Sequence, residues 1–508
     1  MKNNSSFPRD LLLLGMAIMV PAYLFTVGNV LFSSWPLYSR SQTLLFFLTF
    51  FCILLLLFIN RVLFPLTNLL ERHERTFLFL FSLVFFIIQF FLSLSLRHIP
   101  ITDPEQCFTA ACNLAETGHF ADSERSYIYF SRYPFNLGFV YFLSFVFRFF
   151  SLFGFSDRYA QVVFSACLLF SFGNYFCALV VRRLSSFKEE AFFLALNFLT
   201  LPFWTAAAEG YTDIFAVSFP PMILFSFLNT SKTKSIKSSI LFSILFAFLS
   251  FFGMQIRVTV LIVPIACLLQ TLFEGRLRHF FLLFICLITV CLFGHNFVEK
   301  ENTRHLGAEN LQQHRLSVWH YLAMGLPIHE DEGYGQYGYG GWLLFSTSFD
   351  NPQERDIALK KEVKDRIYYL RYPSRLLNLL SRKNLSTFGD GTFRLNELIE
   401  GDEHEPNNFI KQILFYRGRF HFAYQHICTS LFLSQMILAC LSCLQAIRKK
   451  NTNVAALYLT LVGAFLYLSC WETRARYFFM FQFILLAASA LSSMQNTISK
   501  RINLEKKG

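Results

Sequence analysis

Apolar runs long enough to cross a lipid bilayer recur along this chain of 508 residues. One of them, from Phe77 to Leu96, contains no charged residue. A hydrocarbon core of about 30 Å requires a helix of roughly 20 apolar residues. In lipid the backbone groups of a helix must be satisfied within the helix itself, so such runs predict transmembrane helices. We therefore expect an all-α, polytopic membrane protein.

The composition agrees with a membrane location. Hydrophobic residues make up 54% of the chain and charged residues 15%, whereas soluble domains carry about 25% charged residues. The net charge of +12 is expected to reside mostly in cytoplasmic loops, so it does not indicate a nucleic-acid partner. The twelve cysteines are scattered through apolar runs, which favours packing roles over disulfides or metal ligands.

The alternation of apolar runs and basic loops predicts the topology. No small-residue cleavage site follows the first run, so we expect a retained helix there rather than a signal peptide. With both termini in the cytoplasm, every basic cluster falls on the cytoplasmic side of a plasma-membrane protein. We expect about twelve spans, over residues 10–32, 43–64, 76–96, 158–181, 190–208, 213–229, 238–254, 256–273, 279–297, 422–446, 453–471 and 475–494. The basic clusters are Arg61/Arg72/Arg75, Arg182/Arg183/Lys188, Lys232/Lys234/Lys237, Arg276/Arg278, Arg448/Lys449/Lys450 and the tail at Lys506/Lys507.

One further apolar segment, from Phe135 to Phe153, does not fit this alternation if it crosses the bilayer. It follows Pro134 and contains Asn136 and Arg148. We therefore expect an amphipathic helix at the outer interface, the alternative being a thirteenth span.

The topology divides the chain into three parts. Residues 1–297 form an N-terminal transmembrane module with outer loops at 97–157 and 209–213. Residues 298–421 form an extracytoplasmic loop domain, and residues 422–508 hold the last spans and a basic tail. Recurring apolar residues in the loop domain suggest short helices packed over the membrane domain: Ile367, Leu370, Leu376, Leu377 and Leu380.

Carboxylates gather in the outer loops. Asp103 and Glu105 open the first loop, and Glu209 and Asp213 lie in the second. A carboxylate at a membrane boundary is expensive to hold there and usually has a function. It can act as a general base or hold a divalent cation near a phosphate. The alternative for Asp103 is a helix cap, because Pro104 follows it.

Arginines are expected on the same outer face. Arg257 lies between two spans, and Arg474 and Arg476 precede Tyr477 in the last outer turn. The forked donors of arginine match a phosphate group. The alternative is pairing with Glu472 or snorkelling to the interface. Outer carboxylates together with outer arginines suggest a lipid-linked phosphate substrate.

Further features of the loop domain allow predictions. His320 is a candidate contact to a phosphate or a sugar hydroxyl, with a structural role as the alternative. The Gly/Tyr-rich run at 333–341 lacks the ending of a P-loop, which favours an aromatic lid over a carbohydrate. The run at 388–393 is expected to form a turn around Asp390-Gly391. His404 and His421 show no metal-ligand spacing.

Several of these segments together resemble the membrane glycosyltransferases of the GT-C fold. The superfamily includes protein O-mannosyltransferases and lipid A aminoarabinose transferases, and the chain looks closest to the bacterial dolichyl-phosphate-mannose–protein mannosyltransferase-like branch. The resemblance covers most of the chain through short motifs. They are Asp103–Leu114, Arg132–Asn136 (RYPFN), Tyr211–Asp213, Ile256–Thr259, His320–Gly325, Phe388–Phe393 and Glu472–Tyr477.

The resemblance implies a reaction on the outer face of the membrane. The donor would be a sugar on a polyprenyl phosphate, and Asp103 would deprotonate the acceptor hydroxyl, with inversion at the anomeric carbon. Asp213 is the second catalytic candidate. Arginine replaces the lysine of a Lys-Pro-Thr-like motif at Arg257. The remaining candidates are substrate-binding: Glu105, Glu209, Arg257, His320, Arg474, Arg476 and Tyr477.

The expected partners follow from that reaction. They are a polyprenyl-phosphate sugar, a glycan, lipid or protein acceptor, and membrane lipids. A divalent cation is compatible with the carboxylates, but no metal ligand is assigned. Two alternatives stay open, a ligase of lipid-linked saccharides and a transporter or flippase of them. A transporter is expected to carry ionisable residues at mid-membrane and paired broken helices.

Overall fold

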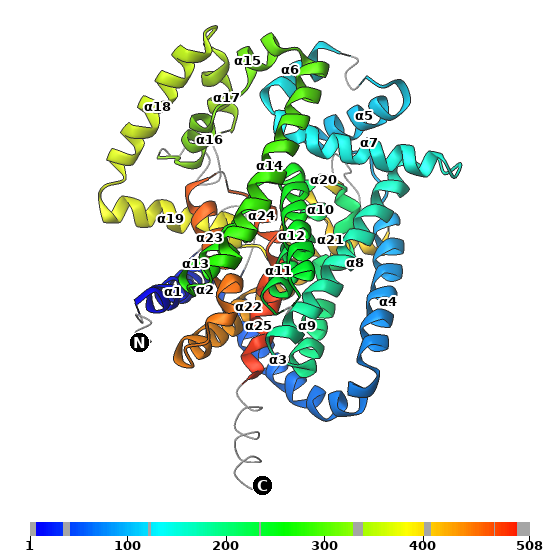
Figure 1. Ribbon diagram of the computed structural model, residues 1–508, viewed down its shortest axis with the longest axis vertical. Helices are drawn as coiled ribbons and strands as arrows, with labels where there is room; N and C mark the ends of the chain where they lie inside the picture. Colours follow the sequence, from blue (N-terminus) through cyan, green and yellow to red (C-terminus); the bar gives the residue numbers. More distant parts are fainter. Residues whose placement is uncertain are drawn as a thin grey trace.

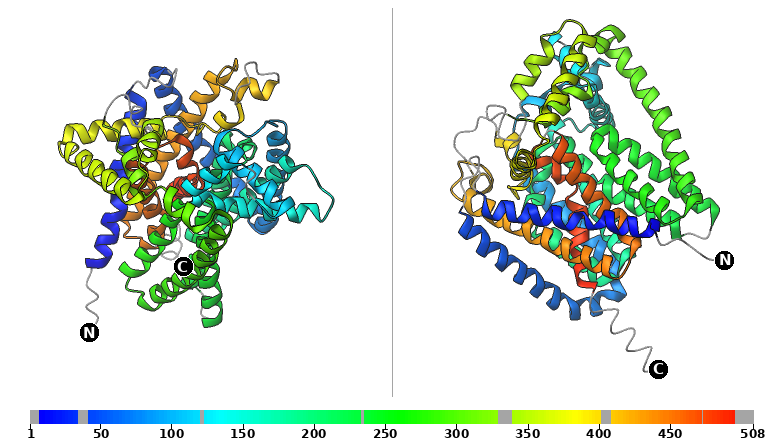
Figure 2. Two further views of the ribbon diagram at one scale, coloured as in Figure 1. Left: turned by 90° about the horizontal axis from the view of Figure 1, so that it is seen from above. Right: turned by 90° about the vertical axis from the view of Figure 1, so that its left-hand side faces the viewer.

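The computed structural model describes residues 7–33, 41–119, 123–232, 235–328, 339–400, 408–471 and 473–494 (Figures 1 and 2). All regular secondary structure in these ranges is helical. By length and composition, nine of the described helical stretches are able to cross a bilayer. The predicted all-α, polytopic fold is therefore confirmed.

The long helices reproduce most of the predicted spans. The stretch Gln42–Leu94 covers two of them, because the chain reverses at a short 3-10 turn between α3 and α4. The bounds are α1 (Phe7–Ala17), α2 (Met19–Phe32), α3 (Gln42–Leu70), α4 (Glu74–Leu94), α8 (Arg158–Leu184), α11 (Phe219–Lys232), α12 (Ile236–Ile256), α14 (Leu277–Leu306), α22 (His421–Arg448) and α23 (Ala455–Cys470).

Five predicted spans are shorter or broken helices. The span at 10–32 is α1 followed by α2, and the span at 213–229 is α10 (Thr212–Ala216) followed by α11. The span at 190–208 is α9 (Phe187–Leu199) followed by the 3-10 turns η3 (Leu201–Trp204) and η4 (Ala206–Glu209). Pro202 has no backbone N–H to continue the helix. The span at 256–273 is η5 (Val258–Leu261) followed by α13 (Ile262–Phe273). The span at 475–494 is divided into α24 (Ala475–Phe479), α25 (Gln482–Ala490) and η8 (Leu491–Met494).

The basic loops gather at one end of the bundle. Arg182, at the end of α8, pairs with Glu74 at the start of α4 and with Glu190 in α9. At the start of α1, Arg9 donates to the carbonyl of Lys450 just after α22, at 2.9 Å. Gln445 of α22 also contacts η8. The first and last described helices thus reach the same end of the bundle.

The opposite end is covered by helices that run across the bundle. Arg97, after α4, pairs with Asp157 before α8 at 2.7 Å, which places both junctions at this end. Here α5 (Thr102–Thr117) and α7 (Leu137–Ser151) lie side by side across the ends of α4 and α8 (Figure 1). The segment at 134–151 is long and apolar enough to span. It lies crosswise to the long helices (Figure 1), and its place at the outer interface stays a prediction.

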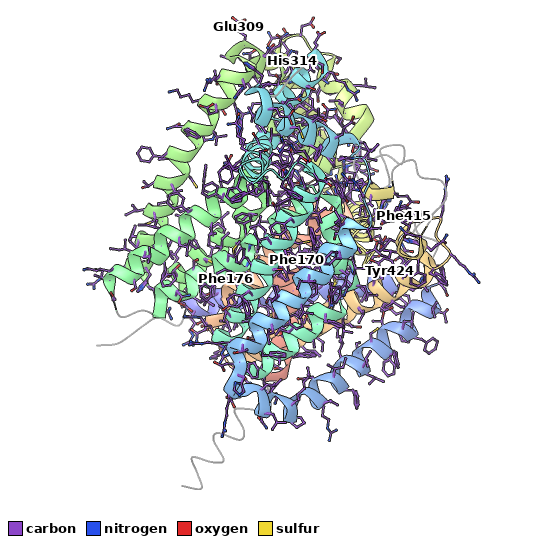
Figure 3. The ribbon with its side chains drawn as sticks, turned by 90° about the vertical axis from the view of Figure 1, so that its right-hand side faces the viewer. Phe170, Phe176, Glu309, His314, Phe415 and Tyr424 are labelled. Atoms are coloured by element: carbon purple, nitrogen blue, oxygen red, sulfur yellow. The ribbon has the colours of Figure 1, made fainter. Side chains whose placement is uncertain are left out.

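The loop domain is a set of short helices joined to the extended C-terminal half of α14. The helices are α15 (Ala308–His314), α16 (Val318–Gly325), α17 (Tyr339–Thr347), α18 (Pro352–Tyr369), α19 (Pro373–Phe388), α20 (Glu397–Glu400) and α21 (Phe409–Leu414). Glu309 and His314 of α15 mark its far end in Figure 3. The predicted turn after α19 is present, with Asp390 accepting from the backbone N–H of Thr392 at 2.9 Å.

The expected short helices are present, and α19 packs against α2 and α24, but not every apolar residue that predicted them is buried. Leu370 is buried, but Ile367, Leu376 and Leu377 are exposed, by 58%, 42% and 55%. The corner between α18 and α19 thus leaves apolar side chains without protein cover, because the corner extends past the edge of the bundle (Figure 1). Residues 333–338 of the predicted lid lie outside the described residues, as do His404 and Glu472, and the last three residues of the lid begin α17.

Phenylalanine rings fill the centre of the bundle. Phe170 of α8 contacts Phe203 and Phe483, each with ring centroids 4.8 Å apart. Phe170 lies deep between the helices in Figure 3. All twelve cysteines are free thiols. Cys440 and Cys443 have CxxC spacing, but both are buried on one helix, which fits the predicted packing role.

Candidate active site

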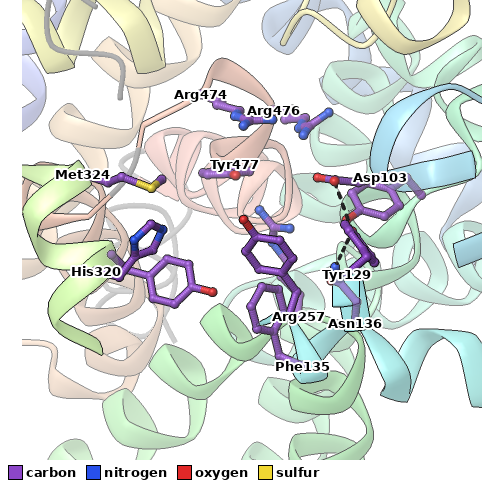
Figure 4. A pocket seen from close by; sticks show the side chains of 13 residues that line it. Asp103, Tyr129, Phe135, Asn136, Arg257, His320, Met324, Arg474, Arg476 and Tyr477 are labelled. Carbon is purple, nitrogen blue, oxygen red and sulfur yellow. Dashed lines mark hydrogen bonds between the residues drawn. The ribbon is translucent and has the colours of Figure 1, made fainter. Parts of the chain in front are cut away.

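A cavity lies at the end of the bundle opposite the basic loops. Its empty volume is about 500 Å³, part of it open to solvent. Six segments that are distant in sequence contribute side chains, and Figure 4 shows them converging. The lining residues are Asp103, Tyr129, Tyr133, Phe135, Asn136, Tyr211, Arg257, His320, Tyr321, Met324, Arg474, Arg476 and Tyr477.

Asp103 is the carboxylate in this lining. It is the second residue of α5, in the first turn, where the helix dipole favours a negative charge. The capping alternative is wrong, because the N-cap residue is Ile101 and no side chain caps the helix. Thr102, just before Asp103, has a φ of 56°. This left-handed conformation is strained by about 1–3 kcal/mol in a β-branched residue, and such strain concentrates at functional sites.

Two neutral side chains orient Asp103. Asn136 donates through Nδ2 to the Tyr129 hydroxyl at 2.9 Å. The Tyr129 hydroxyl in turn donates to Oδ1 of Asp103 at 3.1 Å. Because an amide NH₂ can only donate, it leaves the phenol proton free to point at the carboxylate. The dashed lines in Figure 4 follow this chain from η2 (Pro134–Asn136) through α6 (Glu124–Arg132) to α5.

Two arginines of the cavity are held from behind by buried carboxylates. Asp213 is fully buried, with Oδ1 3.3 Å from Nε of Arg257 and Oδ2 3.7 Å from Nε of Arg476. Arg257 also donates to the Thr212 hydroxyl at 3.2 Å. Glu209 is buried as well, and its Oε1 lies 3.9 Å from Nη1 of Arg476. The carboxylates therefore fix the direction of both guanidinium groups.

The balance of charge in this cluster favours an anion. Burial raises the pKa of Glu209 to about 8, with Arg476 opposing and Asp213 reinforcing the shift. This shift weakens the negative charge that Glu209 sets against the arginines. The guanidiniums of Arg257, Arg474 and Arg476 also face the carboxylates of Asp103 and Asp213. Raising the pKa of Glu209 moves this balance toward a cationic site that a phosphate can neutralise.

Tyr477 connects the three guanidinium groups. The central carbon of Arg257 lies 4.2 Å from the centroid of its ring. Those of Arg474 and Arg476 both lie 5.9 Å from it. Cation–π contacts of this kind restrict the guanidiniums without neutralising them. The ring of Tyr477 thus keeps the three guanidinium groups together at the cavity wall.

His320 faces the cavity from the side opposite Asp103 (Figure 4). Its Nδ1 is 2.7 Å from Oγ of Ser346, whereas its buried Nε2 has no hydrogen-bond partner among the described residues. Burial, with a smaller contribution from Arg355, lowers the pKa of His320 to about 4. The imidazole is therefore neutral at physiological pH. When the Ser346 hydroxyl donates to Nδ1, Nε2 carries the proton and can donate into the cavity.

A buried lysine joins the wall that carries His320 to the wall that carries the arginines. Nζ of Lys383, on α19, donates to the carbonyl of Gly325, the last residue of α16. It also donates to the carbonyl of Trp471, which follows α23, at 2.6 Å. The ammonium group thus lies at the C-terminal, negative ends of two helices. Gly325 allows this approach, because a Cβ there would overlap the backbone at Trp471.

The structure brings together six of the nine residues proposed from sequence. Asp103, Arg257, His320, Arg474, Arg476 and Tyr477 line the cavity. Glu209 and Asp213 lie behind the arginines, and Glu105 is exposed outside the lining. Tyr129 was not selected from the sequence, and Tyr321 was covered only by the His320–Gly325 motif. Asn136 was noted in the interfacial segment and the RYPFN motif, without a role in the site. Within the described ranges, no cluster of three or more His, Cys, Asp or Glu residues is arranged to hold a metal ion.

The fold and the cavity define a helical, multi-pass membrane protein with a polar, arginine-rich site at one end of its bundle. Residues 13–497 match the model of a family described as conserved hypothetical integral membrane proteins. The chain belongs to that family.

No curated protein matches the chain, whereas solved structures do. One of them is the crystal structure of ArnT from Cupriavidus metallidurans bound to undecaprenyl phosphate. It shares 13% identity over 82% of this chain and 78% of ArnT, with a TM-score of 0.37. At that level of similarity, neither residue roles nor an activity can be transferred.

Proposed function

We propose that this protein is a membrane glycosyltransferase of the GT-C type that uses a polyprenyl-phosphate sugar as donor. The observation that carries the proposal is the cavity in which Asp103 faces Arg257, Arg474 and Arg476. Transfer of a sugar from a phosphate to a hydroxyl requires a base and a cationic site for the leaving group. This cavity offers both.

In the proposed chemical step, Asp103 acts on the acceptor, and the arginines and His320 act on the donor. Asp103 removes the proton of the acceptor hydroxyl, and the acceptor oxygen attacks the anomeric carbon with inversion. The bond from that carbon to the phosphate oxygen breaks, and the electron pair leaves with the polyprenyl phosphate. The arginines stabilise the charge that develops on the leaving phosphate, and His320 donates to a phosphate or sugar oxygen from the opposite wall.

The location of the cavity supports transfer on the extracytoplasmic face. The cavity and the basic loops lie at opposite ends of the bundle. Because Lys and Arg concentrate in cytoplasmic loops, the cavity would open to the outer side, with both termini inside. The acceptor hydroxyl would belong to a glycan, a lipid or a protein.

The proposal is tested with the purified full-length protein in proteoliposomes. Polyprenyl-phosphate sugar labelled in the sugar is supplied together with an envelope extract as the source of acceptor. We expect labelled acceptor and free polyprenyl phosphate to appear together. If the intact donor instead crosses the bilayer without cleavage, the protein is a flippase and the proposal fails.

Arg474→Gln is expected to weaken donor binding. This arginine is chosen because replacing Arg257 or Arg476 would also remove a partner of buried Asp213. A hydrogen bond to a charged group contributes about 1.5–3 kcal/mol. The KM for the donor should therefore rise by roughly ten- to one-hundred-fold. Arg419→Gln, the same charge change at an exposed site outside the cavity, should leave KM unchanged. Equal effects of both variants would contradict a phosphate site at Arg474.

Tyr129→Phe is expected to slow the chemical step and leave donor binding unchanged. The variant loses the hydroxyl that donates to Asp103 and accepts from Asn136. With the base no longer oriented, kcat should fall by about ten-fold or more at constant donor KM. Tyr127→Phe on the same helix is the matched control, because Tyr127 does not line the cavity. An unchanged kcat would show that the phenol does not position the base.

A further inference from the structure

The corner between α18 and α19 exposes several apolar and aromatic side chains. We call Ile367, Tyr368, Tyr372, Leu376 and Leu377 the corner patch. Their exposed fractions are 58%, 65%, 45%, 42% and 55%. Figures 1 and 2 show this corner pointing away from the bundle at its side. An exposed apolar patch of this kind marks a surface with a partner.

Two arginines accompany the patch. The guanidinium carbon of Arg371 lies 3.7 Å from the ring centroid of Tyr368 and 4.8 Å from that of Tyr372. That of Arg375 lies 4.1 Å from the ring of Tyr369 and 4.7 Å from that of Tyr372. Both arginines are exposed. Arg371 donates one hydrogen bond to the Tyr372 hydroxyl at 2.8 Å, and Arg375 donates one to the carbonyl of Tyr369 at 3.3 Å. These contacts hold both guanidinium groups over the aromatic rings at the exposed surface, where their other N–H groups can meet an anion.

Hydrogen bonds between the C-terminal half of α19 and α2 fix the position of the corner along the length of α2. Asn384 donates to the Thr26 hydroxyl at 2.8 Å, and Ser381 donates to Oδ1 of Asn29 at 2.8 Å. Both partners lie in the last two turns of α2, which ends at Phe32. Helix α19 therefore crosses the bundle at the end that holds the cavity, and its outer half extends beyond α2.

The apolar side chains of α19 are buried toward its C-terminus and exposed toward its N-terminus. Its inner residues, such as Leu379 and Leu385, are buried, whereas Leu376 is exposed one turn earlier. The neighbouring α2 exposes Leu24 by 48% and Phe32 by 74%, as expected for a helix surface that faces lipid. The patch is thus level with the boundary of the apolar surface of the bundle.

We propose that the corner patch inserts into the outer interface of the bilayer, where Arg371 and Arg375 bind phospholipid phosphates. Amphipathic helices at the interface bury an apolar face to a depth of about 5–10 Å. Tyrosine is enriched at that depth, and arginine suits phosphate oxygens. A protein partner would not explain why the patch lies at the membrane boundary. The inference does not depend on the proposed glycosyltransferase activity.

This contact has a consequence for the cavity. Helix α19 also carries Lys383, which bonds the ends of α16 and α23. Anchoring the outer half of the helix in the bilayer therefore restrains the wall that carries His320. The lipid contact acts as a lateral support for the extracytoplasmic side of the cavity.

The experiment places a photo-crosslinking residue, benzoylphenylalanine, at Leu376 of the full-length protein in its membrane. A matched variant carries it at Asn378, which is exposed but lies two residues on, about 200° around the helix. A third variant at Leu24 of α2 serves as the positive control. After irradiation, we expect phospholipid adducts by mass spectrometry at 376 and 24, with at least a ten-fold lower yield at 378.

Two outcomes would overturn the inference. One is lipid adducts at Leu24 without any at Leu376, which would place the corner outside the bilayer. The other is adducts at Leu376 to a protein, including a second copy of this chain. For the headgroups, the double variant Arg371→Gln, Arg375→Gln should lose the preference for phosphatidylglycerol over phosphatidylcholine in native mass spectrometry. A retained preference would contradict the phosphate contacts.

Discussion

Replacing Asp103 with asparagine is expected to reduce sugar transfer by about 100- to 10,000-fold, the range that a general base contributes. Asparagine has nearly the same shape, and its carbonyl oxygen can still accept the hydrogen bond that Tyr129 donates. It cannot, however, take the acceptor proton at neutral pH. The loss should therefore appear in kcat, with donor KM and thermal stability close to those of the wild type.

Glu105→Gln is the matched control for this substitution. Glu105 lies in the same first turn of α5, is exposed, and is outside the cavity lining. The Glu105→Gln substitution also removes one negative charge from the N-terminus of α5. The control therefore reproduces any general electrostatic effect on the helix. Rates measured side by side in proteoliposomes should separate the two variants by at least about 100-fold. Wild-type turnover by Asp103→Asn would rule out the base and with it the mechanism.

The sequence predicted the architecture well where the signal is local. Each long span carries its own apolar run, so α8 and α22 could be recognised without knowledge of their neighbours. Breaks in helices depend on tertiary context and were missed. Proline at 202 gave a local sign, whereas the division of the last span into α24, α25 and η8 had none. The exposed Leu376 and Leu377 were misjudged because periodicity indicates an apolar face but not what covers it.

The candidate site was only partly accessible from the sequence. Charged residues at the ends of spans are conspicuous, which is why Asp103 and the arginines were selected. Tyr129 and Asn136 are common residue types, and their relation to Asp103 depends on how α5, α6 and η2 pack. Asp103 and Asp213 looked alike, as carboxylates in outer loops. Only the structure separates them, because Asp213 is fully buried behind Arg257 and Arg476.

Asp213→Ala is therefore expected to destabilise the protein rather than to affect the chemical step alone. The substitution removes a carboxylate that lies within 3.3 Å of Arg257 and 3.7 Å of Arg476. The buried carboxylate left behind the two guanidiniums would be Glu209, whose charged form is disfavoured because burial raises its pKa. Removing one member of a buried ion pair costs about 3–5 kcal/mol. We expect a clear loss of thermal stability and faster proteolysis in detergent.

Glu116→Ala is the control variant for this loss of thermal stability. Glu116 pairs with Arg158 at 3.1 Å, but its side chain is 59% exposed, and surface pairs contribute at most about 1 kcal/mol. If Asp213→Ala unfolded at the same temperature as Glu116→Ala and merely lost activity, Asp213 would have a catalytic role, as the sequence suggested. A large difference in stability would instead show that Asp213 holds the phosphate-binding arginines in place. Burial would then distinguish Asp103, which acts as the base, from Asp213, which positions the arginines.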